Sequence, residues 1–320
     1  MRIVNAKILV LVVVAVVTAA CSRDPLPDDG FINVPGGRIA FRVVGSGDST
    51  PILWIHGGPG GTSCGAVANV DGIAAGRPVI FYDQLGSGYS DRIQDIEQFA
   101  RLPRFVEEIV AIRSELGLDE LHLVGHSWGN AVALEYLLTA KPSGIKSAVF
   151  VSPFFGTKRW IADANLLLSE LPVEAQKAVA AAVQSGDYES DEFKAVNDLF
   201  LSKFGTRTPV AQLSLEPCDK NPSGDSGLYR YMWGPSEFVS TGTLKDYDRI
   251  GRLSELNLPV MFVTGQYDEA RPETVEYYHG LINGSKFEVI PDAGHGVYLD
   301  QTELFNNSLV DFFGEVESRP

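Results

Sequence analysis

One stretch of this chain constrains its fold more than any other, because a strand, a sharp turn and a helix follow one another directly. The apolar residues 121–124 are typical of a buried strand, and the run 131–138 is typical of a helix. The residues between them include Gly-His-Ser-Trp-Gly at 125–129, a G-x-S-x-G motif whose two glycines allow a tight turn. This context predicts a strained turn that exposes the hydroxyl of Ser127 above a sheet. The alternative is a chance match in a glycine-rich chain.

Other apolar runs indicate the rest of the sheet. Five of them have the length of buried strands, at residues 52–55, 78–82, 148–151, 259–263 and 286–290. Residues 31–34 and 38–44 alternate in polarity around Pro35-Gly36-Gly37, which is typical of a hairpin. Residues 101–116 show helical spacing. Strands that alternate with helices predict an α/β fold, a mostly parallel central sheet with helices on both faces.

Residues 155–250 interrupt this alternation. Residues 162–184 and 192–204 are typical of two helices, and a passage rich in Pro, Gly, Ser and Asp follows at 216–227. We therefore expect a mostly helical cap at 155–250, inserted into a core made of residues 31–154 and 251–320. The alternative is a second helical domain with no gating role.

The composition excludes some classes of function. The chain carries a formal charge of −15 at pH 7 and has a pI of about 4.7. Such a chain has no basic surface that could displace counterions from phosphates, so nucleic-acid binding is not expected. Its three cysteines form no C-x-x-C motif and no H-E-x-x-H motif is present, so we expect neither a metal site nor a cofactor.

The first twenty residues have the layout of an export signal. Basic residues flank an apolar run at 8–17, and small residues precede Cys21. The run is short for a membrane span, which needs about 20 apolar residues. The segment resembles a bacterial lipobox, so we expect a signal peptide at 1–20, lipidation of Cys21, a tether at 21–30 and an exported, membrane-anchored protein. An ordinary cleaved signal and an uncleaved anchor remain alternatives.

A serine needs a base and an oriented partner to become a nucleophile. His295 lies on a glycine loop just beyond the last apolar strand, and Asp268 lies just beyond the strand at 259–263. Both positions fall at the carboxyl edge of a parallel sheet, and the order Ser127, Asp268, His295 is that of the α/β-hydrolases. We expect these residues to form a catalytic triad. The alternatives are a helix-capping Asp268 and a surface His295.

The glycine loop His-Gly-Gly-Pro-Gly-Gly at 56–61 follows the strand at 52–55. Glycines there leave the backbone N–H groups free to approach a developing oxyanion. We expect the N–H groups of Gly58 and Trp128 to form an oxyanion hole, with Gly57 as the alternative to Gly58.

Three blocks together resemble the proline iminopeptidase family of α/β-hydrolases. They are the loop at 56–61, the segment Tyr-Asp-Gln-Leu-Gly-Ser-Gly-Tyr-Ser at 82–90, and the motif at 125–129. The resemblance extends over residues 31–315. The chain departs from many members at Leu85, where Arg is common, at His126, where Gly is common, and at Asn130, where Gly or Ser is common.

Within that family, the chain is more similar to tricorn-interacting-type aminopeptidases. The cap segment at 231–238 contains a G-P-x-E-F block, and the acid loop at 265–269 ends in Asp-Glu. The resemblance implies that Glu237 and Glu269 hold the α-ammonium of the substrate. Two carboxylates in a partly dry cleft repel each other unless a cation joins them. The alternative is a surface residue at Glu237 and a helix-start acid at Glu269.

These features predict a serine aminopeptidase that releases N-terminal residues, proline or other and often apolar, through an acyl-enzyme. Its partner would be a short peptide or amino-acid amide with a free N-terminus. An esterase, lactonase or amidase of the same fold is the alternative, and a binding lipoprotein is a third reading. Trp54, Trp160 and Trp233 are candidates for an apolar pocket, Trp233 above all. Cys64 and Cys218 either form a disulfide or remain free thiols.

Overall fold

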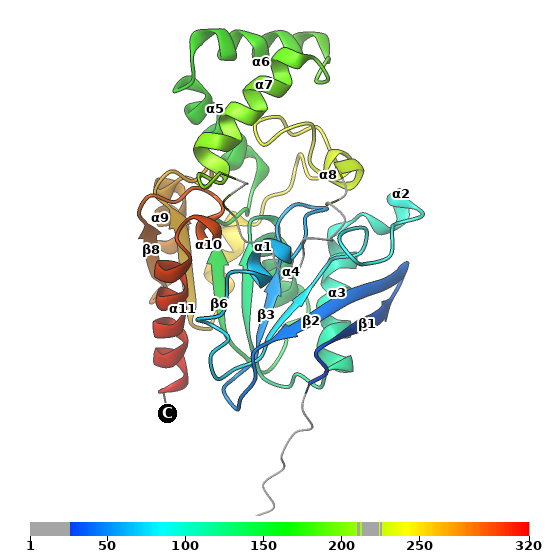
Figure 1. The fold of residues 1–320 in the computed structure, drawn as a ribbon, viewed down its shortest axis with the longest axis vertical. Helices are drawn as coiled ribbons and strands as arrows, with labels where there is room; N and C mark the ends of the chain where they lie inside the picture. Colours follow the sequence, from blue (N-terminus) through cyan, green and yellow to red (C-terminus); the bar gives the residue numbers. More distant parts are fainter. Residues whose placement is uncertain (1–25, 210–211, 213–223, 225, 320) are drawn as a thin grey trace, which may run out of the picture.

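A single eight-stranded sheet forms the centre of the protein (Figure 1). The computed structural model describes residues 26–209, 212, 224 and 226–319. The strands are β1 (Asp29–Val34), β2 (Gly37–Val44), β3 (Ile52–Ile55), β4 (Val79–Tyr82), β5 (Leu121–His126), β6 (Ile145–Val151), β7 (Val260–Gly265) and β8 (Lys286–Ile290). Their order is β1-β2-β4-β3-β5-β6-β7-β8. The hairpin β1–β2 and the pair β2–β4 are antiparallel, and all other pairs are parallel, so the predicted mostly parallel sheet is confirmed.

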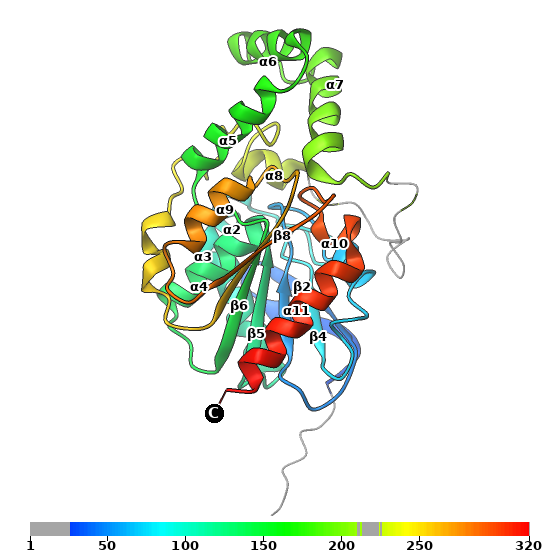
Figure 2. The ribbon, with the colours of Figure 1, turned by 90° about the vertical axis from the view of Figure 1, so that its left-hand side faces the viewer.

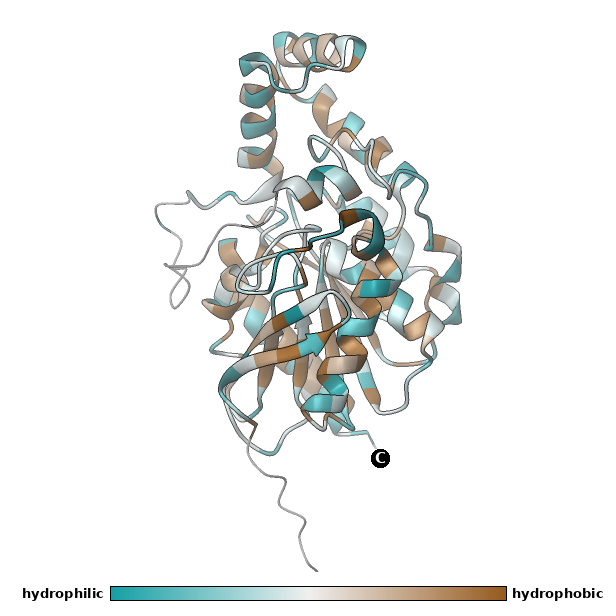
Figure 3. Cartoon of the chain, turned by 90° about the vertical axis from the view of Figure 1, so that its right-hand side faces the viewer, coloured by the Kyte–Doolittle hydropathy of each residue, from teal (hydrophilic) through white to brown (hydrophobic). Residues whose placement is uncertain are grey.

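Helices cover both faces of the sheet because successive strand residues point to opposite faces. In β3, Leu53 belongs to the hydrophobic cluster that also contains residues of α3 (Leu102–Glu115), α4 (Trp128–Thr139) and α9 (Pro272–His279). Trp54 instead belongs to the cluster on the other face, which contains residues of α1 (Cys64–Val67), α10 (Val297–Asp300) and α11 (Thr302–Glu317). Figure 2 shows the sheet between these two layers, and Figure 3 shows the hydrophobic residues concentrated on its strands. A short helix, α2 (Ile96–Phe99), lies before α3.

The described part of residues 155–250 is mostly helical, apart from the irregular stretch 233–249, and lies above the sheet (Figure 1). It contains α5 (Thr157–Ser169), α6 (Val173–Ser185), α7 (Asp191–Phe200), the π-helix η1 (Leu201–Gly205), α8 (Ser226–Met232) and the start of the 3₁₀ helix η3 (Ile250–Glu255). Several of these elements share their own hydrophobic cluster. The prediction of one helix over 162–184 is wrong. Pro172 lacks an N–H and has an extended ψ of 146°, so the chain turns there and begins a new helix.

The predicted signal peptide, the lipidation site Cys21 and the first half of the predicted tether, residues 21–25, lie outside the described residues. Within the described ranges, no helix combines the length and the apolar character needed to cross a bilayer.

Candidate functional site

The turn that carries Ser127 is strained, as the sequence predicts. Ser127 has φ 54° and ψ −122°, and it joins β5 directly to the first residue of α4. A Cβ on Gly129 would lie 2.2 Å from the carbonyl oxygen of Ile55. Helix and strand therefore approach so closely that no side chain fits at position 129. Because the helix begins so close to the strands, the turn is tight and Ser127 lies at the carboxyl end of the sheet.

Asp268 and His295 come together beside this turn. Nδ1 of His295 lies 2.8 Å from Oδ1 of Asp268, which is within hydrogen-bond distance. The same carboxylate accepts hydrogen bonds from the N–H of Ala270 (2.7 Å) and the hydroxyl of Thr264 (2.9 Å). Burial opposes the charged form of Asp268, but the imidazole of His295, the hydroxyl of Ser152 and the N–H of Ala270 outweigh burial and lower its pKa. An ionised carboxylate here fixes the orientation and the tautomer of the imidazole.

Ser127 lines a small cavity under the cap, and His295 lies next to the serine turn, where its ring centroid is 4.9 Å from that of His126. The cavity is lined by Gly58, Pro59, Ser127, Trp128, Phe154, Trp160, Tyr229, Trp233, Glu237 and Leu244. The ring of Trp160 also stands edge-on to the imidazole of His295, with centroids 5.6 Å apart. Within the described chain, the hydroxyl of Ser127 forms no hydrogen bond to His295. The bond between nucleophile and base is often long in unliganded enzymes and shortens when the substrate binds.

The predicted oxyanion donors lie at the same cavity. Trp128 is the first residue of α4, so its N–H has no acceptor within the helix. Gly58 has φ +116°, a conformation that favours glycine, and its peptide bond to Pro59 is cis. A Cβ on Gly57 would lie 3.0 Å from Cβ of Ser127. Gly57 therefore approaches the serine directly, Gly58 lines the same cavity, and the choice between them stays a prediction.

The two predicted amine-binding glutamates also reach this site. Glu269 is only 3% exposed, and its Oε1 lies 3.8 Å from Nε2 of His295. Glu237 accepts a hydrogen bond of 2.6 Å from the hydroxyl of Tyr229. Burial raises the pKa of both carboxyls, and for Glu269 the negative charges of Glu237 and Asp268 raise it further. Among the described residues, neither glutamate pairs with a lysine or an arginine.

The aromatic candidates separate into two groups. Trp160 and Trp233 line the cavity, and their rings meet edge-on at 6.3 Å. Trp54 does not line it, because Trp54 points into the core and packs against Tyr298 with ring centroids 5.4 Å apart. Within the described ranges, no group of His, Cys, Asp and Glu side chains is arranged to hold a metal ion.

Comparison with known proteins agrees with this geometry. A family model described as the alpha/beta hydrolase fold matches residues 50–302. The proline iminopeptidase of Heyndrickxia coagulans is 41% identical over 293 residues, which cover 90% of this chain and 99% of that protein. The chain belongs to the proline iminopeptidase family of α/β-hydrolases.

Solved structures place the family in a wider context. A proline iminopeptidase from Mycobacterium smegmatis is 27% identical with a TM-score of 0.77, and the match covers 90% of this chain and 98% of that one. The esterase RhEst1 from Rhodococcus sp. ECU1013 shares 18% identity with a TM-score of 0.63, over 91% of this chain and 100% of that one. At that identity the likeness to RhEst1 concerns the fold alone.

In this member of the proline iminopeptidase family, the block at 82–90 holds the glycine loop against the serine turn. Gln84 donates through its side-chain amide to the carbonyl of His56 (2.9 Å) and accepts from the indole N–H of Trp128 (2.9 Å). Asp83 accepts from the N–H and the hydroxyl of Ser63, each at 2.9 Å, and from the N–H of Tyr89. The sequence showed this block only as a mark of the family, because its contacts span segments far apart in the chain.

Two further residues hold the loop that carries His295, and no sequence pattern predicted a role for either of them. Nε2 of His126 and Oγ of Ser152 each lie 3.0 Å from the carbonyl oxygen of His295, and both donate to it. Burial and the neighbouring His295 lower the pKa of His126 to about 3, so its ring is neutral at physiological pH. Ser152 has φ 49° at the end of β6. The departure from the family at His126 thus adds a support for the histidine loop.

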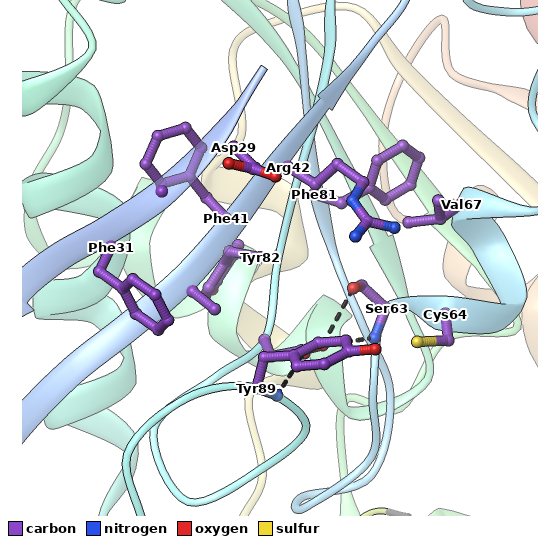
Figure 4. Close-up of a pocket in the computed structure, with 13 residues that line it drawn as sticks. Asp29, Phe31, Phe41, Arg42, Ser63, Cys64, Val67, Phe81, Tyr82 and Tyr89 are labelled. Atoms are coloured by element: carbon purple, nitrogen blue, oxygen red, sulfur yellow. Dashed lines mark hydrogen bonds between the residues drawn. The ribbon is translucent and has the colours of Figure 1, made fainter. Parts of the chain in front are cut away.

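A second cavity, of about 190 Å³, lies at the hairpin edge of the sheet (Figure 4). It is lined by Asp29, Gly30, Phe31, Ala40, Phe41, Arg42, Ser63, Cys64, Val67, Phe81, Tyr82, Asp83 and Tyr89. None of the predicted catalytic residues lines it. Cys64 is disulfide-bonded, so the alternative of a free thiol at Cys64 is wrong. Cys21 and Cys218 both lie outside the described residues, so a bridge to Cys218 stays a prediction.

Proposed function

We propose that the protein is a serine aminopeptidase that removes the N-terminal residue from short peptides or amino-acid amides. The observation that carries this proposal is the pair of carboxylates, Glu237 and Glu269, at the cavity and at the base His295. Both carboxyls have raised pKa values, and no cationic side chain among the described residues neutralises them. A bound α-ammonium would supply the missing positive charge, whereas a blocked N-terminus would not.

The proposed reaction follows from the placement of the groups. Ser127 Oγ attacks the carbonyl carbon of the first residue, and Nε2 of His295 takes the hydroxyl proton. The hydrogen bond of 2.8 Å to Asp268 supports the imidazolium that forms. The N–H groups of Trp128 and of Gly58 or Gly57 receive the oxyanion. His295 then gives the proton to the leaving amine. In the second half of the reaction, water gives a proton to His295 and attacks the acyl carbon, and the proton returns to Ser127 Oγ as the free amino acid leaves.

The position of Glu269 explains why cleavage would stop after one residue. The α-nitrogen and the scissile carbonyl of a first residue are separated by one carbon atom. Glu269 lies 3.8 Å from the base that serves Ser127, so an ammonium held by Glu269 stands beside the reacting carbonyl. A second residue before the scissile bond would move the ammonium away from the carboxylates. We therefore propose that the glutamate pair sets the register of cleavage.

The cavity supports an apolar first residue. Phe154, Trp160 and Trp233 line it, and their rings meet edge-on. Aromatic walls favour compact apolar groups. The name of the Heyndrickxia coagulans relative supports proline as the residue released.

One panel of substrates tests the proposed function. A chain of residues 22–320 would be assayed on aminoacyl anilides, on their N-acetylated forms and on short p-nitrophenyl esters, with Ser127→Ala as the control. We expect turnover of free-amine anilides that is lost in Ser127→Ala. Equal rates on free and acetylated anilides would contradict the role of Glu237 and Glu269. Activity confined to esters would favour the esterase reading, and activity that persists in Ser127→Ala would exclude Ser127 as nucleophile.

We also propose that the protein is exported and anchored to a bacterial membrane by a lipid on Cys21. The proposal is supported by the basic, apolar and small-residue layout of residues 1–21. Mass spectrometry of the mature protein from membranes tests it. We expect a chain that begins at a lipid-modified Cys21, and a mature chain that keeps residues 1–20 would contradict the proposal.

A further inference from the structure

A segment of the cap is hydrogen-bonded directly to both loops that carry the proposed catalytic groups. The carbonyl oxygen of Phe204, in η1, accepts from the N–H of His295 at 2.9 Å and from the N–H of Glu269 at 3.3 Å. One cap carbonyl therefore joins the backbone of the base to the backbone of the proposed amine-binding residue. We refer to residues 204–208, which comprise the end of η1 and the three residues after it, as the strap.

The carboxylate of Asp300 fastens the strap to the histidine loop. It accepts from the N–H of Thr208 at 2.7 Å and from the N–H of Arg207, whose two distances are 3.0 and 3.1 Å. It also accepts from the N–H of Gly294, next to His295, at 2.9 Å. Hydrogen bonds to an ionised acceptor are about twice as strong as neutral ones. Asp300 thus holds two strap residues and the neighbour of the proposed base at one point.

Packing leaves the strap little freedom to sit elsewhere. The N–H of Gly296 donates to the carbonyl of Gly205 at 3.1 Å. A Cβ on Gly294 would lie 2.4 Å from that same carbonyl oxygen, so the two segments touch backbone to backbone. The guanidinium of Arg207 lies 4.1 Å from the ring centre of Tyr267, the residue before Asp268.

We propose that Asp300 is a positioning residue whose clamp on the strap sets the alignment of His295 with Ser127. The inference rests on the proposed function, because it concerns the base of that reaction. Asp300 touches no group that reacts. It acts through the N–H groups of Gly294, Arg207 and Thr208, and the strap then holds the N–H groups of His295 and Glu269 through Phe204. Alignment of the base and placement of the substrate's ammonium would therefore depend on one docked cap segment.

Substitution of Asp300 tests this clamp in the intact chain of residues 22–320. Asp300→Ala removes every acceptor, whereas Asp300→Asn keeps one acceptor oxygen. A misplacement of about 1 Å lowers turnover by about 100-fold. We expect kcat on aminoacyl anilides to fall by about 10- to 100-fold in Asp300→Ala, with a smaller change in KM and partial recovery in Asp300→Asn. Glu303→Ala, an exposed acidic position at the start of α11, is the matched control and should retain wild-type kcat.

Two further readouts separate this inference from the proposed function and from a loss of folding. The first is the rate at which a fluorophosphonate labels Ser127, which needs an aligned base but no peptide substrate. The second is amide hydrogen exchange in 262–272 and 286–300. We expect slower labelling and faster exchange in both segments of Asp300→Ala, at a melting temperature that still allows assay. Wild-type kcat, labelling and exchange in Asp300→Ala would overturn the clamp. If wild-type protein is labelled at Ser127 but cleaves no anilide, the proposed function fails while labelling and exchange still decide the role of Asp300.

Discussion

Oε1 of Glu269 lies 3.8 Å from Nε2 of His295, so a carboxylate that can hold a cation stands beside an imidazole that can accept a proton. The imidazole is fixed from its other side by Asp268, at 2.8 Å. In the proposed reaction, the substrate's ammonium group and the bond to be cleaved lie next to each other, beside Glu269 and His295. Recognition of the N-terminus and proton transfer would therefore be parts of one arrangement.

The glutamate pair should determine selectivity for a free amine. A charge-assisted hydrogen bond contributes about 1.5–3 kcal/mol, which corresponds to about 10- to 100-fold in kcat/KM. We expect Glu237→Gln and Glu269→Gln each to lower kcat/KM on a free-amine anilide by that factor, and to leave the N-acetylated anilide nearly unchanged. Glu276→Gln, at an exposed position of α9, serves as the control. Equal losses on both substrates would show that the glutamates do not read the amine.

The same preference should depend on pH. Burial raises the pKa of Glu237 and Glu269 above the ordinary value for a glutamate. Each carboxyl is therefore neutral over a wider acidic range than usual and attracts an ammonium less strongly there. The ratio of kcat/KM for free over acetylated substrate should fall as pH falls through these raised pKa values. It should also fall again above about pH 8, where an α-amino group loses its proton. A ratio that stays constant with pH would contradict the charge-based account.

His126 should support turnover without titrating. Its pKa of about 3 leaves the ring neutral at the pH of the assay, with Nε2 donating to the carbonyl of His295. His126→Phe would leave a buried carbonyl with one donor fewer, which costs about 1–3 kcal/mol. We expect a lower melting temperature and a lower kcat on anilides, while His126→Gln, which keeps a donor, should lose less. Full activity and stability in His126→Phe would show that Ser152 alone is sufficient.

Gly129, which follows the turn at Ser127, can be compared with Gly314 in a test of stability. A Cβ at Gly129 would lie 2.2 Å from the carbonyl oxygen of Ile55, so Gly129→Ala should destabilise the fold by about 3 kcal/mol or more. Gly314 lies in the interior of α11, and a Cβ there would meet nothing within 4 Å. Gly314→Ala should instead stabilise by about 0.5–1 kcal/mol, because alanine favours helices. Urea unfolding measures both changes in stability, and a similar effect at both positions would contradict the claim that the turn at Ser127 excludes a side chain at position 129.

Local patterns predicted much of this fold. The apolar run at 121–124 and the glycines at 125 and 129 predicted the turn at Ser127, because that turn depends on neighbouring residues. The position of His295 after the last strand predicted its meeting with Asp268, because parallel strands end at one edge. Pro172 shows the limit of periodicity, since the helical spacing continues across the residue that ends one helix and begins the next.

The supports of the site could not be predicted in the same way. Ser152 and Asp300 are polar residues with no distinctive spacing, and Gln84 stood out only as part of the block at 82–90. Each of the three contacts a backbone group far away in the chain. Their partners become neighbours only when the sheet and the cap have formed. Trp54 shows a different limit. From the sequence it is a candidate for the pocket because it is aromatic, but its position on β3 points it into the core.

Mass spectrometry of the products from one short peptide, offered with a free and with an acetylated N-terminus, tests the central claim most directly. The account predicts that wild-type protein releases the first residue from the free peptide and leaves the acetylated peptide intact, and that Ser127→Ala releases nothing. Cleavage of the acetylated peptide at the same rate, or release of N-terminal fragments longer than one residue, would contradict it.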